Sequence, residues 1–148
     1  MKKILFTLIL FITSCGYQPI YIGQGQENLT FQKITLNGEK KINQKIINSL
    51  KFKQNKNSSL RNELILNSNY KIEETSKNSK GQVISYRSKI QVNLIIKKEN
   101  EIIKSKNFTQ DFSYNSLDNK FELTEYQNEI KNNLINKVIE EIIIYINL

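Results

Sequence analysis

Hydrophobic and polar residues alternate with a period of two along the middle of the chain. Three segments show this pattern, each with most of its apolar residues on one parity: residues 64–72, 84–96 and 108–114. In the longest segment, Ser88 is the one polar residue at the even-numbered positions. Successive side chains of a strand point to opposite faces, so each segment predicts a strand with one buried face. A polar loop over residues 73–81 and a tight turn at residues 98–101 would join these strands into an antiparallel meander.

The segments that flank this meander have different patterns. Residues 29–36 predict another strand, ended by Asn37-Gly38. The apolar parity of this strand shifts between Phe31 and Ile34, which indicates either burial on both faces or a bulge. Residues 39–52 and 117–148 have apolar residues at steps of three and four, which is typical of amphipathic helices.

Two features of the last helix bear on its ends. Thr124 followed by Gln127 fits a capping box, but we expect the helix to begin earlier, near Asp118. Residues 142–146, Ile-Ile-Ile-Tyr-Ile, are apolar on every side and rich in β-branched side chains. This tail is therefore expected to be either part of the core or in contact with another protein.

The predicted order of elements is β-α-β-β-β-α. It indicates an α+β fold, with a four-stranded mixed sheet and two helices packed on one face. The first strand–helix–strand passage is long enough for a parallel crossover, which makes the sheet mixed. The opposite face of the sheet would be polar and open.

The first 15 residues differ from the rest of the chain. Two lysines precede a short apolar run that ends in Ile12-Thr13-Ser14-Cys15, which resembles a bacterial lipobox. In such motifs the cysteine thiol receives a diacylglyceryl group and the chain is cleaved just before it. The predicted division is a lipoprotein signal peptide over 1–14, a lipidated tether over 15–27 and one α+β domain over 28–148. A simple signal peptide with an incidental Cys15, or an uncleaved signal anchor, is the alternative.

The chain is basic, with 22 Lys and Arg against 14 Asp and Glu and a formal net charge of +8. A basic domain often binds nucleic acid. A protein that is exported from the cytoplasm does not meet nucleic acid, so we expect no nucleic acid as a partner. We expect the partner to be an anionic membrane surface or an anionic lipid instead. Membrane attachment would come from the lipid anchor at Cys15.

Residue types that usually carry out catalysis are scarce. The chain has no histidine, and Cys15 is its one cysteine. A lipid on that thiol leaves no thiolate nucleophile, zinc cluster or intrachain disulfide. Adjacent pairs such as Ser76-Lys77 and Ser79-Lys80 leave a Ser–Lys hydrolase as a minor alternative. We therefore predict a protein that is not an enzyme, with no metal and no cofactor.

The exposed parity of the longest predicted strand places Arg87 and Lys89 on the same face. Asp111 and Ser113 have the matching parity on the next strand and are expected to lie opposite them. This surface is interpreted either as a solvated face with cross-strand charge pairs or as part of an anion-binding surface.

A resemblance to a known family rests on several features together. After the lipobox the chain reads Cys15-Gly16-Tyr17-Gln18-Pro19, and Gly81-Gln82 precedes the longest predicted strand. Together with the length of the chain and the order of its elements, these features resemble the LPS-assembly lipoprotein LptE (RlpB) family. Gly16 stands where an aspartate would favour retention in the inner membrane, so we expect the periplasmic side of the outer membrane.

The resemblance implies a specific function. Members of this family plug an LptD-type outer-membrane β-barrel, assist its assembly and bind lipopolysaccharide during its insertion into the outer leaflet. Their basic positions fall in the loop before the long strand and near the start of the last helix, where the nearest matches here are Lys80, with Lys77 close by, and Lys120. We add Arg87 from the sheet face as a fourth lipopolysaccharide-binding candidate. The alternative is an auxiliary lipoprotein of another ABC-type lipid-transport system of the envelope.

Overall fold

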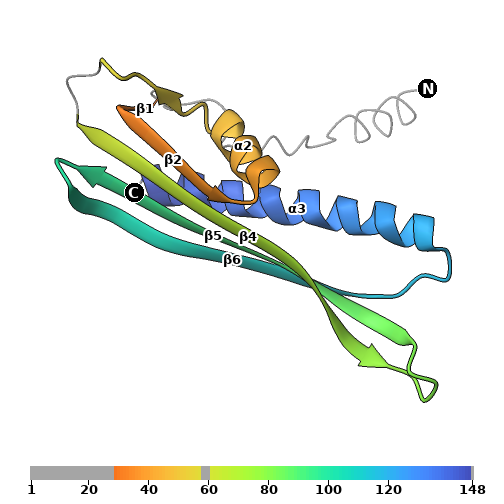
Figure 1. The fold of residues 1–148 in the computed structure, drawn as a ribbon. Coiled ribbons are helices and arrows are strands. Elements are labelled where there is room, and N and C mark those ends of the chain that lie inside the picture. Colours follow the sequence, from red (N-terminus) through yellow and green to blue (C-terminus); the bar gives the residue numbers. More distant parts are fainter. Residues whose placement is uncertain (1–28, 58–60, 148) are drawn as a thin grey trace, which may run out of the picture.

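Residues 29–57 and 61–147 are described by a computed structural model (Figure 1). The lipobox, Cys15 and the predicted tether lie outside these residues. The elements in chain order are β1 (Thr30–Phe31), β2 (Lys33–Gly38), α2 (Lys40–Ser49), β3 (Lys53–Gln54), β4 (Asn62–Lys77), β5 (Val83–Lys98), β6 (Glu101–Asn115) and α3 (Lys120–Asn147).

The main sheet confirms the predicted fold class. Its four strands have the order β2-β4-β5-β6, with β2 parallel to β4 and the other neighbours antiparallel. Both helices lie on one face, where α2 packs against β2 and β4 while α3 packs against β5 and β6 (Figure 1). The other face, called the open face below, carries neither of the described helices. The predicted parallel crossover is present because α2 connects β2 to the strand beside it.

The predicted strand over residues 29–36 is divided at Gln32. Its first part, β1, pairs in parallel with β3, a two-residue strand that the sequence did not reveal. The second part, β2, belongs to the main sheet. The break explains the shift in parity, because Phe31 can then enter the core and meet Phe52 edge to face at 5.4 Å. Ile34, on the other side of the break, also packs against the core.

The hairpin of β4 and β5 is longer than predicted. We expected a polar loop from residue 73 to residue 81, but β4 continues to Lys77. Polar side chains support this extension, since the hydroxyls of Thr75 and Ser85 lie 2.7 Å apart across the strands. The Asn78 carboxamide then closes the loop by accepting hydrogen bonds from two backbone N–H groups, and Gly81 adopts a φ of +78°.

The turn between β5 and β6 confirms the prediction at residues 98–101. Glu99 and Asn100 have φ values of +51° and +73°. Positive φ at both central residues is the type I′ geometry that matches the twist of a two-residue hairpin.

Helix α2 ends at Ser49, three residues before the predicted end at residue 52. Lys51 adopts a left-handed φ of +53°, which turns the chain out of the helix. Leu50 and Phe52 nevertheless remain buried, so the apolar pattern of the sequence extends beyond the end of the helix. At the other end of this segment Gly38 has a φ of +83°, and a Cβ there would lie 1.9 Å from the Ser68 carbonyl oxygen.

Helix α3 begins with Asn119 as its cap. The Asn119 Oδ1 atom accepts a hydrogen bond from the backbone N–H of Phe121 at 2.9 Å. The proposed capping box at Thr124 is wrong, because Thr124 lies within α3 rather than at its start and its hydroxyl donates to the Lys120 carbonyl. The apolar tail is helical, with Ile142 fully buried and Ile144 half exposed, so one side of the tail belongs to the core.

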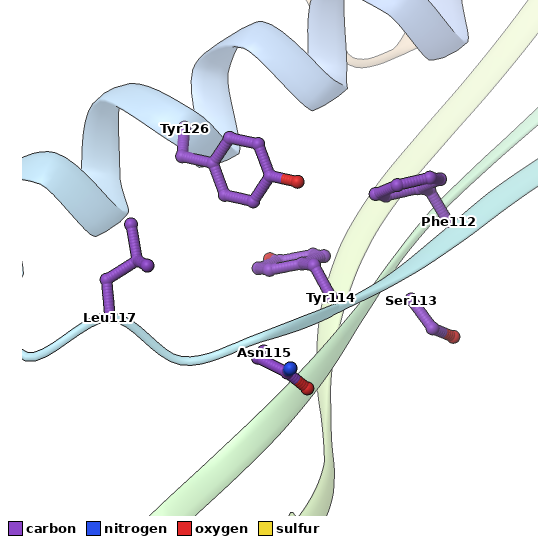
Figure 2. Close-up of a pocket in the computed structure, with 6 residues that line it drawn as sticks. All are labelled: Phe112, Ser113, Tyr114, Asn115, Leu117 and Tyr126. Atoms are coloured by element: carbon purple, nitrogen blue, oxygen red, sulfur yellow. The ribbon is translucent and has the colours of Figure 1, made fainter.

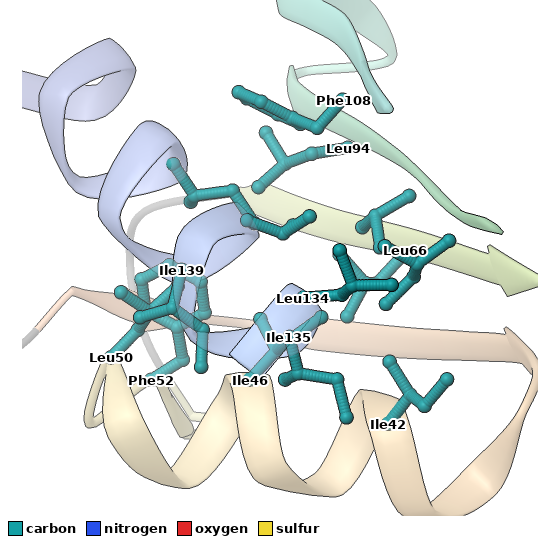
Figure 3. Close-up of a cluster of buried hydrophobic side chains, with 14 of the residues drawn as sticks. Ile42, Ile46, Leu50, Phe52, Leu66, Leu94, Phe108, Leu134, Ile135 and Ile139 are labelled. Carbon is teal, nitrogen blue, oxygen red and sulfur yellow. The ribbon is translucent and has the colours of Figure 1, made fainter. Parts of the chain in front are cut away.

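One apolar core joins the sheet to both helices (Figure 3). Its fully buried side chains include Ile42, Ile46, Leu64, Leu66, Ile90, Val92, Leu94, Val138 and Ile142. Ser88 is also fully buried, and its hydroxyl lies 3.0 Å from the Tyr70 hydroxyl and 3.2 Å from that of Tyr114. Within the described ranges, neither helix is both long enough and apolar enough to cross a membrane.

Candidate anion-binding surface

The candidate residues lie at one end of the sheet, called the distal end below. It comprises the loop of residues 78–82, the adjoining parts of β4, β5 and β6, and the start of α3. The backbone N–H of Ser116 donates to the Ile84 carbonyl at 2.9 Å, which holds the connection to α3 against the hairpin. The chain thus brings segments near residues 77, 87 and 120 to the same end of the molecule (Figure 1).

Arg87 lies on the open face with the partners predicted for it. It is directly opposite Ser113, and its Nε donates to the Ser113 hydroxyl at 3.2 Å. The same Nε lies 3.8 Å from the Asp111 carboxylate. Both side chains of this ion pair are about half exposed, so water screens their attraction.

Two further cations share this face and were not among the predicted lipopolysaccharide-binding residues. Lys71 and Lys89 are directly opposite each other on β4 and β5, and Lys89 is also opposite Asp111 on β6. Like charges in directly opposed positions repel, so carboxylates nearby are needed to offset the repulsion between the two lysines. Alternation alone indicated Lys89, but the position of Lys71 could be known only once the length of the hairpin fixed the register.

Glu73 provides one of these anions. It is opposite Arg87 and forms an ion pair with Lys71. The hydrogen bond and positive charge of Lys71, followed by the charges of Lys89 and Arg87, lower the pKa of the Glu73 carboxyl. Glu73 and Asp111 therefore offset most of the positive charge on this surface.

Lys77 and Lys80 occupy the tip of the hairpin and differ in their surroundings. The Lys77 ammonium lies 2.9 Å from the Glu74 carboxylate. The backbone N–H of Lys80 is held by the Asn78 side chain, while its own ammonium makes no ion pair or hydrogen bond to any residue the structure describes. Lys80 is thus available to an anion on a well-defined loop.

Lys120 is exposed at the first position of α3. It lies on the helix side of the sheet, whereas Arg87 lies on the open face. The structure therefore brings the four predicted residues to the same end of the molecule without joining them in one pocket. Neither of the two hollows described below is lined by any of them.

An aromatic cluster at the distal end was not predicted from the sequence. Tyr114 stacks on Tyr86 and Phe112 at centroid distances of 5.8 and 6.4 Å, and meets Tyr126 of α3 edge to face at 5.6 Å. A hollow of about 490 Å³ adjoins Phe112, Tyr114 and Tyr126, and Leu117 also lines it. Figure 2 shows the residues that line this hollow. The residues come from two strands, a connection and a helix, so no single segment of sequence reveals the cluster.

The exposed charged groups of this surface are suited to binding an anion. Ser76 and Lys77 do not form a reactive pair, because their side chains interact separately with Ser85 and Glu74. In the described part of the chain, His, Cys, Asp and Glu form no group that could hold a metal ion. The exposed ammonium and guanidinium groups can pair with phosphate or carboxylate groups.

Comparisons with known proteins identify relatives by fold. No family model and no curated protein matches the sequence. Rare lipoprotein B from Shewanella oneidensis has a similar structure, with a TM-score of 0.60 and 10% identity over 78% of this chain and 93% of that chain.

Two further lipoproteins show the same fold. Uncharacterized lipoprotein B from Nitrosomonas europaea has a TM-score of 0.58 at 14% identity, covering 78% of this chain and 79% of that one. A minor lipoprotein from Acinetobacter baumannii has a TM-score of 0.55 at 13% identity, covering 78% and 88%. The resemblance predicted from the sequence is thus confirmed at the level of the fold, which is the fold of rare lipoprotein B.

Proposed function

We propose that this chain is an outer-membrane lipoprotein of the LPS-assembly LptE (RlpB) family. In this proposal Cys15 bears the lipid, and the folded domain plugs an LptD-type β-barrel and assists its assembly. The domain also binds lipopolysaccharide during its insertion into the outer leaflet. The observation that supports this most directly is the fold shared with 93% of rare lipoprotein B, in a chain whose residues 12–15 resemble a lipobox.

The surface of the domain is compatible with this role. The interior wall of a large barrel is polar, and side chains alternate between its inside and outside. The open face is polar over most of its area, which suits the polar interior of such a barrel. The lipid phosphates are compact anions, which lysine ammonium groups bind as point charges.

Of the four candidate lipid-binding residues, two are better placed than the others. Lys77 and Arg87 already have carboxylate neighbours, which an incoming phosphate would have to displace. Lys80 and Lys120 have no such ion pair within the described residues. We therefore assign the main electrostatic contribution to Lys80 and Lys120.

Purification of the tagged full-length chain from membranes tests the proposal. We expect a large outer-membrane β-barrel to copurify in near-stoichiometric amount. Cys15→Ala serves as the control for lipidation, and this variant should no longer incorporate a fatty-acid label. Copurification with an inner-membrane ATPase complex would instead support the auxiliary lipoprotein of an ABC-type system, and recovery without any barrel would overturn the proposal.

A further inference from the structure

A second hollow lies at the centre of the open face, away from the candidate cations. Its volume is about 250 Å³. Five carboxamide side chains from three neighbouring strands line it: Asn67, Asn69, Gln91, Asn93 and Asn107. We call this group the carboxamide hollow.

The strand register explains why these side chains gather there. Asn67, Asn93 and Asn107 are directly opposite one another across β4, β5 and β6. In the next row on the same face, Asn69 is opposite Gln91, which is opposite Thr109. Two rows of the open face are therefore uncharged and polar at all six positions.

This neutrality contrasts with the chain as a whole, of which 24% is charged. The row that follows toward the distal end consists of Lys71, Lys89 and Asp111. The row on the other side contains Ile65 opposite Ile95. The carboxamide hollow is thus a neutral polar area between a charged row and a small apolar one, and its electrostatics suit a neutral ligand better than an anion.

The hydrogen-bonding capacity of the hollow is not used within the described structure. None of the five carboxamides forms a side-chain hydrogen bond to another described residue. Each carboxamide offers two N–H donors and one carbonyl acceptor. Hydroxyl groups both donate and accept, so a ligand with several hydroxyls on a small ring would satisfy these groups.

The hollow is also held rigidly. The residues that alternate with its lining point into the core, and Leu66, Val92, Leu94 and Phe108 are all at most 1% exposed. β4 and β5 are the two central strands of the sheet. Side chains on such strands have fixed spacing, so the loss of conformational entropy when a ligand binds is small.

We infer that the carboxamide hollow binds a neutral oligosaccharide, with one sugar ring seated among the five carboxamides. Ile65 and Ile95 at its border can contact the C–H face of the next ring. A protein partner is less well suited, because the hollow offers none of the aromatic or arginine anchors that dominate stable protein interfaces. The inference goes beyond the proposed function, since it requires neither the barrel nor the lipid phosphates.

Side-chain NH₂ signals in ¹⁵N NMR spectra provide a direct test. The full chain would be studied in a detergent without sugar groups and titrated separately with a hexose trisaccharide and an N-acetylglucosamine trisaccharide. We expect selective shifts of the five carboxamide signals with at least one sugar, and a dissociation constant of about 1 mM. Response to the hexose would indicate an outer polysaccharide as the source, and response to the N-acetylated sugar a cell-wall glycan.

A charge variant and a matched control test whether the carboxamides themselves bind the sugar. Asn93→Asp together with Asn107→Asp keeps the side-chain volume, removes donors and adds negative charge. Two lost hydrogen bonds should weaken sugar binding by about tenfold. Asn128→Asp with Asn133→Asp, at exposed positions of α3, should leave it unchanged. The inference is overturned if neither sugar shifts the five signals, if the Asn93/Asn107 variant binds as well as the control, or if only a protein partner perturbs these signals.

Discussion

Ser88 shows how a polar residue can occupy a fully buried strand position. It is the one break in the apolar parity of β5, and its hydroxyl bridges the hydroxyls of Tyr70 and Tyr114. A buried hydroxyl with hydrogen-bond partners avoids most of the cost of leaving water. The sequence identified the position of this break but could not identify its partners, because they come from two different strands.

Tyr70 should show the effect of this environment on its titration. Burial raises the pKa of the Tyr70 hydroxyl, an effect that the hydrogen bond to Ser88 reduces without reversing. We expect its phenolate absorbance to develop above the usual tyrosine pKa of about 10. The difference between titrations of the native chain and of Tyr70→Phe isolates this residue.

The same shift has a consequence for stability at alkaline pH. Because the folded-state pKa is raised, the contribution of Tyr70 is fully present below the usual tyrosine pKa of about 10 and is lost as the pH rises through the folded-state value. Urea denaturation across this range should show a smaller loss of stability in Tyr70→Phe. Equal losses in both chains would contradict the shift.

At the scale of elements, the regular patterns of the sequence predicted more than its polar stretches did. Alternation identified β4, β5 and β6, and steps of three and four identified both helices. The polar end of β4 was missed because its backbone pairing continues without apolar side chains. β3 was missed because two residues are too few to establish a period.

The tail of α3 provides a matched test of its assignment to the core. Ile142 is fully buried whereas Ile144 is 50% exposed, two residues away in the same helix. Ile142→Ala should lower the free energy of unfolding by about 2–5 kcal/mol through lost burial and a cavity. Ile144→Ala should change it by about 0.5 kcal/mol or less. Similar losses in urea denaturation would show that the two sides of the tail are equally packed.

At the scale of the whole molecule, the candidate cations were predicted individually but their arrangement was not. Lys77, Lys80, Arg87 and Lys120 come from two strands, a loop and a helix start, so only the three-dimensional fold shows that they share one end. The sequence also did not show which of them already have carboxylate partners. The carboxamide hollow depends on the register of three strands, so it could not be predicted from the sequence either.

Lys80 and Lys120 allow a test of lipid binding that preserves the fold. The double variant Lys80→Gln/Lys120→Gln should weaken binding to purified lipopolysaccharide and make it less sensitive to salt, because two exposed charges that pair with phosphate are removed. Lys53→Gln/Lys56→Gln removes the same total charge at exposed positions near the other end of the sheet. Equal effects of the two double variants in a salt series would exclude a specific role for Lys80 and Lys120.

The arrangement of the sheet also has a consequence for the order in which it folds. β4, β5 and β6 are consecutive in sequence and form a meander from local contacts, whereas β2 joins them only through the parallel crossover. Local contacts form faster than parallel pairings that must close a longer loop. We expect β2, the main-sheet strand nearest the amino terminus, to dock last. In pulse-labelled hydrogen exchange its amides should gain protection after those of the meander, and the reverse order would contradict this. Until then the meander would expose the edge of β4 and leave the neighbouring core uncovered.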